Sequence, residues 1–489
     1  MIAAHGVREL GLVVVHAVVH TVNAGIIVYM LWLNSCYALL LILSVPQLLR
    51  HWRIADDVNL RLLRAANVIP PLSVLVPAFN EENTIVGSVL SFLSLEYPQH
   101  EVVVVNDGST DATMERLIEA YDLVEVPPAY PNVVPTLPVK AFYRSRLYPK
   151  LVCVEKMNGG GKGDALNAAL NAARYPYVLA VDADTFIERD ALLRLARPFL
   201  LGQRVAAVGA TVRISNGSVI EHGRVVDAHV DSRWLPGIQA VEYLRSFLFG
   251  RLGWNRLGGG LIISGAFGLF KQEHLHAIGG YNVETVTEDI DLVIRLHKYL
   301  RGIGSGDALT FVPDPVAWTE GPVTVKVLRA QRERWHRGLI ATLVEHRDMM
   351  FNPRYGVIGL VVFPFYVFGE LLAPVIECLG YVVFICGAMI GVINYRFALV
   401  FLGVSVGYGF LLSLWAVVLE EISFRRYSTT RDLLKLLWFS TIEQFGYRQL
   451  TVWFRLLAFP RYLRGDMRWG TMTREGPRAP APPDLEAAL

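Results

Sequence analysis

The sequence has little of several features that mark other classes of protein. It holds 4 cysteines in 489 residues, and their spacing fits neither a metal-binding motif nor a disulfide framework. Its basic and acidic residues nearly balance, at 46 and 44, and no basic patch is interleaved with aromatic residues. Nucleic acid is therefore not expected as a partner. We also find no internal repeat and no pattern of a cleavable signal peptide.

Hydrophobic residues, by contrast, are abundant. They make up 53% of the chain, above the usual level for soluble domains. The excess lies before Arg50 and between Tyr355 and Phe459. Residues 25–49 are long and apolar enough to cross a bilayer as one helix. Arginines follow this segment, and such an excess marks the cytoplasmic side. We therefore expect an integral protein of the cell (inner) membrane with a cytosolic domain.

The chain divides into regions by composition. We expect N-terminal membrane segments at residues 1–69 and a cytosolic domain with an interfacial helix at residues 70–350. C-terminal transmembrane and interfacial helices are expected at residues 351–460, and a partly disordered tail at residues 461–489. In the third region, residues 397–419 predict a clear span. Residues 433–459 predict either a span or a re-entrant or interfacial element.

The central region alternates short apolar runs with acid-bearing turns and helical patterns. This alternation predicts an α/β domain with a mostly parallel sheet. The expected strands include residues 72–77, 101–107, 151–155, 177–181, 205–214 and 261–268. Residues 122–150 interrupt the rhythm and are rich in proline and tyrosine, so we expect an insertion or a surface arm there.

Two carboxylates follow one expected strand directly. Asp182 and Asp184 come after residues 177–181, and ligands of open α/β sheets bind at the carboxyl ends of strands. Two acids in such a place need a cation or a hydrogen-bonded partner. Mg²⁺ binds through one or two carboxylates together with substrate phosphates. The pattern favours a metal–diphosphate site, and an Asp N-cap at a turn is the structural alternative.

Polar residues follow the other expected strands as well. Asn80 after the first strand suits a helix N-cap, and Asp107 ends the second strand. Residues 158–167 place glycines and Lys162 before a helix. This predicts either a phosphate-binding turn or a flexible one. It is not a Walker A loop, because Gly163 follows the lysine.

Three further segments carry candidate residues. Small residues at 264–268 would let a ligand ring approach the backbone. The acids of residues 287–291 open a helix, where the helix dipole alone already favours them. The basic helix 325–346 contains Gln-Arg-Glu-Arg-Trp at 331–335 and is an interfacial candidate.

Taken together, these ordered motifs resemble the membrane-integrated processive glycosyltransferases of family 2, the group of cellulose, chitin, hyaluronan and poly-N-acetylglucosamine synthases. The resemblance covers roughly residues 72–335 and the flanking spans. It implies a GT-A-type α/β domain in the cytosol, flanked by transmembrane and interfacial helices. Residues 122–150 and 215–236 depart from the pattern and put the acceptor side in doubt.

The resemblance also implies a role for each motif. The nucleotide-binding residues would be Pro77, Asn80, Glu82, Asp107, Lys162 and Asp182. The metal ligands would be Asp184 and Asp182. Asp289 would be the catalytic base, next to Glu288. The residues that contact the acceptor and the diphosphate would be Gly265, Ala266, Phe267, Gln331, Arg334 and Trp335.

The implied reaction is inverting, metal-dependent transfer of a sugar from a UDP-sugar to the end of a growing polysaccharide, coupled to export. The cofactor would be Mg²⁺ or Mn²⁺, and N-acetylglucosamine is favoured by resemblance alone. The expected partners are the UDP-sugar, the polysaccharide acceptor, the lipid bilayer and an accessory export or regulatory subunit. The alternatives are non-processive transfer to a lipid carrier, a nucleotide-sensing transporter and a catalytically silent binding subunit.

Polar residues in the C-terminal region are candidates for lining a path for the polymer. They are Glu377, Glu420, Glu443 and Arg448, and polar groups inside membrane segments are functional candidates by default. The structural alternative is that they lie at the ends of spans, in the headgroup region.

Overall fold

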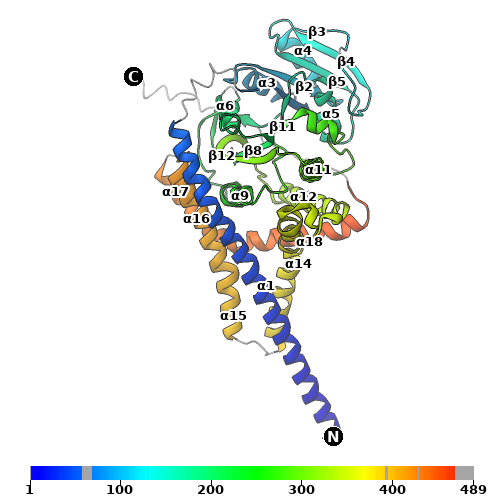
Figure 1. Ribbon diagram of the computed structural model, residues 1–489. Helices are drawn as coiled ribbons and strands as arrows, with labels where there is room; N and C mark the ends of the chain where they lie inside the picture. The colour runs from blue at the N-terminus through cyan, green and yellow to red at the C-terminus, as the bar shows by residue number, and fades with distance from the viewer. Residues whose placement is uncertain are drawn as a thin grey trace.

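The computed structural model describes residues 2–57, 69–128, 130–221, 223–390, 395–427 and 429–467. Most of the tail predicted to be partly disordered lies outside the described residues. An α/β domain forms one end of the molecule, and long helices project away from it (Figure 1). Helix α1 (Ile2–Asp57) contacts α14 (Ala373–Ile390) and α16 (Tyr408–Ser423) in this projecting part.

A mixed ten-stranded sheet lies at the centre of the α/β domain, in the order β3-β4-β5-β2-β1-β6-β11-β8-β12-β7. Its strands are β1 (Leu72–Ala78), β2 (His100–Asn106), β3 (Leu123–Glu125), β4 (Val139–Ser145), β5 (Leu151–Lys156), β6 (Tyr177–Val181), β7 (Phe186–Ile187), β8 (Val205–Ile214), β11 (Phe267–Lys271) and β12 (Ala308–Thr319). A separate hairpin joins β9 (Val219–Glu221) and β10 (Arg224–Asp227).

The predicted α/β class is confirmed, and the sheet is parallel in its core. Strands β5, β2, β1 and β6 form one parallel ladder, and β8 and β12 form a parallel pair. Strand β11 is antiparallel to β6 and β8, so the carboxyl ends of all these parallel strands lie at one edge. We call this edge the rim, and the opposite edge the far edge. The strands β3, β4 and β7 add antiparallel pairs.

Helices cover both faces of the sheet. They are α3 (Ile85–Leu93), α4 (Thr113–Tyr121), α5 (Lys162–Ala172), α6 (Ala191–Leu195), α7 (Arg197–Leu200), α8 (Trp234–Arg245), α9 (Leu252–Arg256), α10 (Gln272–Ala277), α11 (Glu288–Gly302) and α12 (Val325–Glu345). Alternate strand residues point to opposite faces. Val74 of β1 therefore packs in the core cluster that holds Phe92 of α3, whereas Leu75 packs in the cluster that holds Leu166 of α5 and Leu292 of α11.

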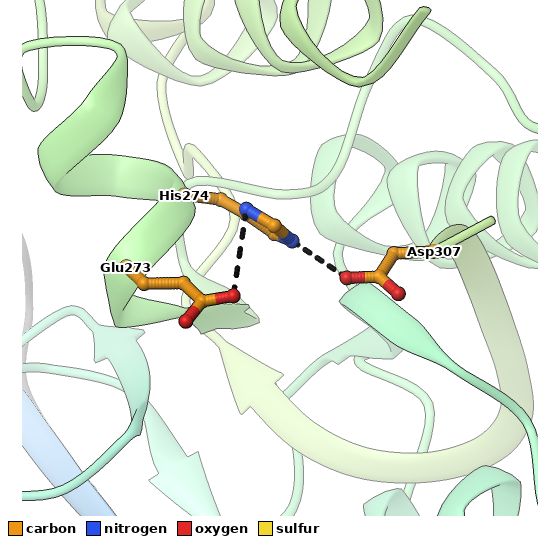
Figure 2. Close-up of side chains that lie close together, drawn as sticks. All are labelled: Glu273, His274 and Asp307. Atoms are coloured by element: carbon orange, nitrogen blue, oxygen red, sulfur yellow. Dashed lines mark hydrogen bonds and ion pairs between the residues drawn. The ribbon is translucent and has the colours of Figure 1, made fainter. Parts of the chain in front are cut away.

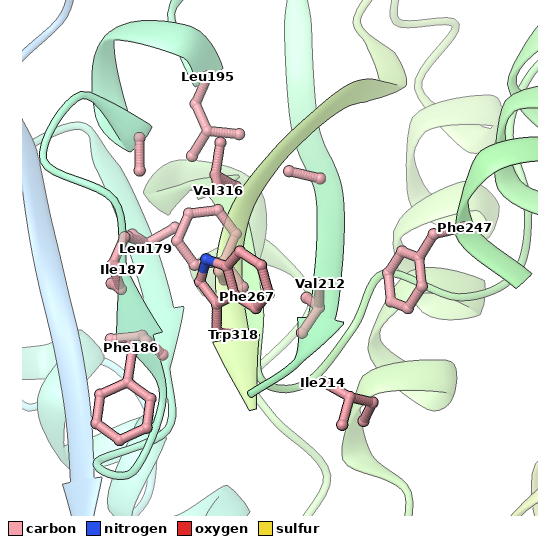
Figure 3. Packing of buried hydrophobic residues seen from close by; sticks show 14 of the residues in the cluster. Leu179, Phe186, Ile187, Leu195, Val212, Ile214, Phe247, Phe267, Val316 and Trp318 are labelled. Carbon is pink, nitrogen blue, oxygen red and sulfur yellow. The ribbon is translucent and has the colours of Figure 1, made fainter. Parts of the chain in front are cut away.

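Part of the first core cluster lies around Trp318 of β12, the strand that pairs with β8 and β7. Figure 3 shows Trp318 and Phe267 at its centre, between Leu179 and Val212. Trp318 is 1% exposed, and its indole N–H donates to Glu188 Oε1 at 2.9 Å. A large side chain buried with its polar atom satisfied contributes apolar burial without an unpaired donor. This packing fixes the end of β6, and hence the start of the rim.

Two sequence-based expectations are corrected here. Residues 122–150, expected as an insertion or a surface arm, are not an arm on the surface, because β3 and β4 in this segment extend the main sheet at its edge. The strand expected at 261–268 begins only at Phe267. Gly258 and Gly259 adopt positive φ angles of 102° and 111°, so the chain turns sharply before the apolar run. That run then forms a buried loop at the rim.

Within the part of the chain that the structure describes, two helical stretches, His16–Arg53 and Ile358–Met389, are long and apolar enough to cross a membrane. The predicted span at 397–419 is helical in α15 (Tyr395–Leu402) and α16, with a π-helical segment between them. The segment 433–459 is not one straight helix. Helix α17 (Thr430–Ile442) and helix α18 (Arg448–Leu463) are separated by non-helical backbone at Phe445 and Gly446. In Figure 1, α18 lies across the base of the α/β domain, which favours the re-entrant or interfacial alternative.

The polar residues proposed to line a path have charged partners inside the protein. Glu377 pairs with Arg448 at 2.8 Å, which joins α14 to α18. Glu443 pairs with Arg245 of α8 at 2.6 Å, and Glu420 pairs with Arg213 of β8 at 2.5 Å. The last two pairs connect the C-terminal helices to the α/β domain. A role in lining a path stays a prediction.

Candidate functional site

The ends of three neighbouring strands build the rim. Asp107 follows β2, and its backbone N–H donates to the carbonyl of Ala78 at the end of β1 (2.9 Å). Asp182 follows β6, and its N–H donates to the carbonyl of Ala266 (3.4 Å). Because β1 lies between β2 and β6, these acids lie on the same edge of the sheet. The sequence-based expectation of acids from separate turns on one edge agrees with this placement.

The glycine-rich loop between β5 and α5 connects these two acids. The N–H of Gly159 donates to Asp107 Oδ1 at 3.2 Å. Three residues later, Lys162 forms an ion pair with Asp182 and donates to the carbonyl of Gly265 at 2.5 Å. A Cβ at Gly159 would lie 2.6 Å from the Cβ of Asp164, so only glycine fits there. The loop is therefore fixed at both ends rather than free to move as a simple turn.

Gly265 joins the lysine to the predicted base. Its carbonyl accepts from Lys162, and its N–H donates to Asp289 Oδ2 at 3.1 Å. Lys162, Gly265, Glu288, Asp289 and Tyr281 all line one small pocket. The N-terminal turn of α11 thus presents its acids to the loop that precedes β11. This pocket places the predicted catalytic residues beside the predicted nucleotide-binding lysine.

Electrostatics in this pocket is dominated by acids. Burial raises the pKa of Glu288, with the charge of Asp289 acting in the same direction, and Lys162 only partly opposes this. Burial alone would lower the pKa of Lys162, but the charges of Asp182, Glu288 and Asp289 outweigh it and raise that pKa. The lysine therefore stays charged. Lys162 is thus a cation with several acidic neighbours, and a bound anion can take the place of one of these acids beside it.

Asn80 and Glu82 act differently from the expectation of a helix cap. Asn80 has a left-handed φ of 56°, and its Oδ1 accepts from the N–H of Thr110 at 2.8 Å. Helix α3 begins after Thr84, so the predicted N-cap is wrong. Glu82 Oε2 accepts from the N–H of Ala112 at 3.1 Å. Both side chains therefore brace the turn after Asp107. Pro77 lies in β1 and pairs with Val105.

The donor set for a divalent cation lies in the turn after β6. The Asp182 side chain is 29% exposed, whereas Asp184 is buried at 8%. Two carboxylates in one turn are hard oxygen ligands of the type that Mg²⁺ and Mn²⁺ accept. The residues present therefore fit the predicted metal. Ala266 contributes its backbone next to Asp182. Phe267 is fully buried in the core, so its side chain cannot reach an acceptor.

The Gln-Arg-Glu-Arg-Trp motif at residues 331–335 of helix α12 lies largely inside the protein. Gln331 and Arg334 are buried, and α12 packs against α18. The positive charge of Arg334 acts on Glu288 and lowers its pKa in part. A Cβ at Gly338 would lie 2.1 Å from Thr287 Oγ1, so α12 touches the start of α11. The guanidinium of Arg332 lies over the ring of Trp335, at 4.6 Å from its centroid. Helix α12 therefore contacts both the start of α11 and α18.

Another cluster with metal-ligand residue types lies at the far edge. Figure 2 shows His274 between Glu273 and Asp307. Asp307 Oδ2 lies 2.7 Å from His274 Nε2, and its carboxylate also contacts Arg204 at 2.8 Å and Lys271 at 3.4 Å. Cations of the protein already neutralise this carboxylate, so the cluster is a salt-bridge network.

A second cluster of this kind binds elements together. Asp291 is fully buried and lies 2.9 Å from His346 and 2.6 Å from Arg295. It therefore links α11 to the end of α12.

Sequence reasoning missed a buried lysine behind the rim. Lys156 is 0% exposed and lies 2.6 Å from Asp107 and 2.5 Å from Asp164. The available signal was a lysine that ends a buried parallel strand next to the strand carrying Asp107. Lysine is almost never fully buried unless it is paired.

Comparisons with known proteins agree on one family. The model "Glycosyl transferase family 2" matches residues 73–132, and "Glycosyltransferase like family 2" matches residues 129–338. The poly-beta-1,6-N-acetyl-D-glucosamine synthase of Staphylococcus epidermidis is 30% identical over 269 residues, covering 55% of this chain and 54% of the relative. The synthase of that name from Staphylococcus aureus strain MSSA476 is 28% identical over the same shares. The match thus spans about half the length of these relatives.

Two solved structures also align with much of this chain, each with a TM-score below 0.5. The mannosyltransferase PcManGT from Pyrobaculum calidifontis, in complex with GDP-Man and Mn²⁺, is 18% identical with a TM-score of 0.48, covering 86% of this chain and 99% of that one. S. aureus TarS 1–349 in complex with UDP-GlcNAc is 16% identical with a TM-score of 0.40, covering 78% and 92%.

Proposed function

Since residues 73–338 form a glycosyltransferase family 2 domain, we propose that the protein transfers a sugar from a UDP-sugar to an acceptor hydroxyl at the rim. The observation that carries the proposal is the pocket shared by Lys162, Gly265 and Asp289. In this pocket, Lys162 and the carboxylate of Asp289 both bond to the backbone of Gly265, so a cation and a carboxylate lie close together. A transferase needs the first for its departing diphosphate and the second for its acceptor.

Asp289 would remove the proton from the acceptor hydroxyl as that oxygen attacks the anomeric carbon. The N–H of Gly265 holds the carboxylate in one orientation. A positioned base of this kind contributes about 10²- to 10⁴-fold to rate. One displacement inverts the anomeric centre, so an α-linked donor would give a β-linkage. Glu288 lies beside this carboxylate, and burial together with the charge of Asp289 raises the pKa of Glu288.

The departing diphosphate would meet positive charge from Lys162 and Arg334. Lys162 pairs with Asp182 in this structure, and a bound diphosphate would share the lysine with that aspartate. Arg334 adds a planar guanidinium suited to phosphate oxygens. Mg²⁺ or Mn²⁺ held by Asp182 and Asp184 would supply further stabilisation of charge on the leaving oxygens. The nucleoside would lie over Asp107 and the turn braced by Asn80 and Glu82.

The similarity to poly-beta-1,6-N-acetyl-D-glucosamine synthases supports UDP-N-acetylglucosamine as donor and a polysaccharide end as acceptor. The two apolar helices support placement in a membrane. The arginines that follow residues 25–49 support a cytosolic side for the α/β domain. Residues 1–69 and 351–460 would then form the membrane part around the domain at 70–350. Export of the polymer through this part, with or without an accessory subunit, completes the proposal. Transfer of a single sugar to a lipid carrier is the alternative.

The test is UDP release by the purified full-length protein in detergent, measured donor by donor with Mg²⁺ or Mn²⁺, followed by sizing of the product. We expect release from UDP-N-acetylglucosamine and a polymer. The matched control is Asp190→Asn, which changes an acid paired with Arg194 on α6 and should leave release unchanged. No release from any UDP-sugar would overturn the proposal. A single lipid-linked sugar would retain the transferase and refute polymerisation.

A further inference from the structure

A fully buried ion cluster lies behind the rim and does not belong to the pocket of Asp289. Lys156 ends β5, and its side chain is 0% exposed. Its ammonium group lies 2.6 Å from Asp107 Oδ1 and 2.5 Å from Asp164 Oδ2, and it also donates to the carbonyl of Met157. The three donors of the ammonium therefore all have partners inside the protein. A side chain so enclosed cannot touch a bound nucleotide.

The carboxylate of Asp107 is held from one side by this cluster. Lys156 and the N–H of Gly159 both donate to the same oxygen, Oδ1. Burial raises the pKa of Asp107, and Lys156 is the main group that opposes this effect. Without the lysine, the carboxylates of Asp107 and Asp164 would face each other with no cation between them. Buried like charges of this kind cannot both stay ionised.

The second carboxylate of the cluster reaches the segment between β3 and β4. Asp164 Oδ1 accepts from the N–H of Leu137 at 3.1 Å, and Asp164 lies in the first turn of α5. Lys156 thus connects the end of β2, the glycine-rich loop and this segment through one ammonium group. The cluster forms part of the support for the loop that ends in Lys162.

We propose that Lys156 is a positioning residue that keeps Asp107 ionised and oriented to accept a hydrogen bond from the uracil or ribose of the donor. This inference rests on the proposed function, because it requires the nucleoside to lie over Asp107. The lysine acts through the aspartate rather than by contact with the ligand. Its loss should therefore weaken nucleotide binding while the chemical step at Asp289 continues.

The experiment compares UDP affinity by calorimetry for the full-length protein and the variants Lys156→Met, Asp107→Asn and the double variant. Each single change should weaken UDP binding by about ten-fold or more, equal to about 1.4 kcal/mol. The double variant should bind no worse than Asp107→Asn alone, because the lysine acts only through that carboxylate. KM for the donor should rise with little change in kcat. The matched control is Lys140→Met, a surface lysine 3.5 Å from Glu155 of β5, which should bind UDP normally.

Two further results separate positioning from simple structural support. The preference for UDP over ADP should shrink in Lys156→Met, since base recognition is lost along with affinity. If that variant does not purify as a folded protein, Lys156→Arg and Lys156→Gln replace it, and the charged variant should bind UDP more tightly. Equal affinity in this pair, normal UDP binding by Lys156→Met, or losses that multiply in the double variant would overturn the inference. Absence of UDP binding by the unchanged protein would instead refute the proposed function.

Discussion

The rim and the far edge of the same sheet carry similar residue types in different balance. At the rim, Asp182, Glu288 and Asp289 surround one lysine and line or border a pocket. At the far edge, Asp307 meets His274, Arg204 and Lys271, and the exposed Glu273 also contacts Lys271. At the far edge, cations of the protein already neutralise the carboxylate of Asp307, and such a network contributes to the fold. An excess of acid around one cation leaves room for a ligand to complete the balance.

The largest effect that would sharpen this comparison is expected at the base. Asp289→Asn should lower kcat for UDP release by about 10³-fold, since the amide cannot accept the acceptor proton. UDP affinity should stay close to that of the unchanged protein. The matched far-edge variant is Glu273→Gln, in a side chain that is 64% exposed, and its kcat should be unchanged. A normal kcat for Asp289→Asn would remove the functional distinction between the edges.

The next effect concerns the cation of the rim. Lys162→Met should lower kcat/KM for the donor by about 10²-fold, because a charged donor near the leaving group is lost. Lys271→Met removes a lysine of the far-edge cluster and should leave kcat/KM unchanged. Steady-state kinetics with UDP-N-acetylglucosamine measures both. Equal losses in the two variants would show that the lysine of the rim acts only through folding.

A smaller effect, on stability alone, is expected at the far edge. Asp307→Ala removes the bonds to His274 and Arg204 and should lower the free energy of unfolding by about 1–3 kcal/mol. Thermal unfolding of the detergent-solubilised protein gives the corresponding drop in Tm. Specific activity below that Tm should be preserved. A loss of activity without a loss of Tm would mean that the far edge, too, is a functional site.

The smallest effect is an opposite response of the two edges to pH. The contacts of Asp307 with His274, Lys271 and Arg204 outweigh burial and lower its pKa, so its stabilisation is present above about pH 4 and is lost as the pH falls. Burial raises the pKa of Glu288, so its contribution is present below about pH 4 and is lost as the pH rises through the raised pKa.

Unfolding scans from pH 3 to pH 8, roughly the range in which carboxylates titrate, would measure this contrast. The stability of Glu288→Gln relative to the unchanged protein should increase as the pH rises. The relative stability of Asp307→Asn should decrease over the same direction. Parallel profiles for the two variants would contradict the assignment of opposite charge balance.

The parallel core and its acids could be predicted because strand ends are local features. Asp107 and Asp182 each follow a short apolar run directly, and the alternation of runs and helices indicates parallel strands. The prediction of an N-cap at Asn80 was wrong because its side chain accepts a hydrogen bond from Thr110 in a neighbouring turn. This long-range contact cannot be read from local helix propensity. The predicted strand at residues 261–268 began too early, because a buried loop and a buried strand have the same apolar composition.

Other parts of the site depend on contacts that no local pattern specifies. The burial of Lys156 requires that β5 lie beside β2, so that two acids meet its ammonium group. The burial of Gln331 and Arg334 depends on long-range packing in which α18 lies against α12. The helix break at Gly446 separates α18 from α17 and allows this placement. Gly446, which lies among polar residues in the segment 433–459, was a visible but ambiguous signal of that break.

The most direct measurement is photolabelling of the full-length protein with 5-azido-UDP, followed by mass spectrometry of the peptides. The central claim is that the donor nucleotide binds at the carboxyl ends of β1, β2 and β6. It predicts labels within residues 78–82, 106–111 or 157–164, which excess UDP removes. Labels confined to peptides of the far edge, such as residues 271–276, or labels that UDP does not displace, would contradict it.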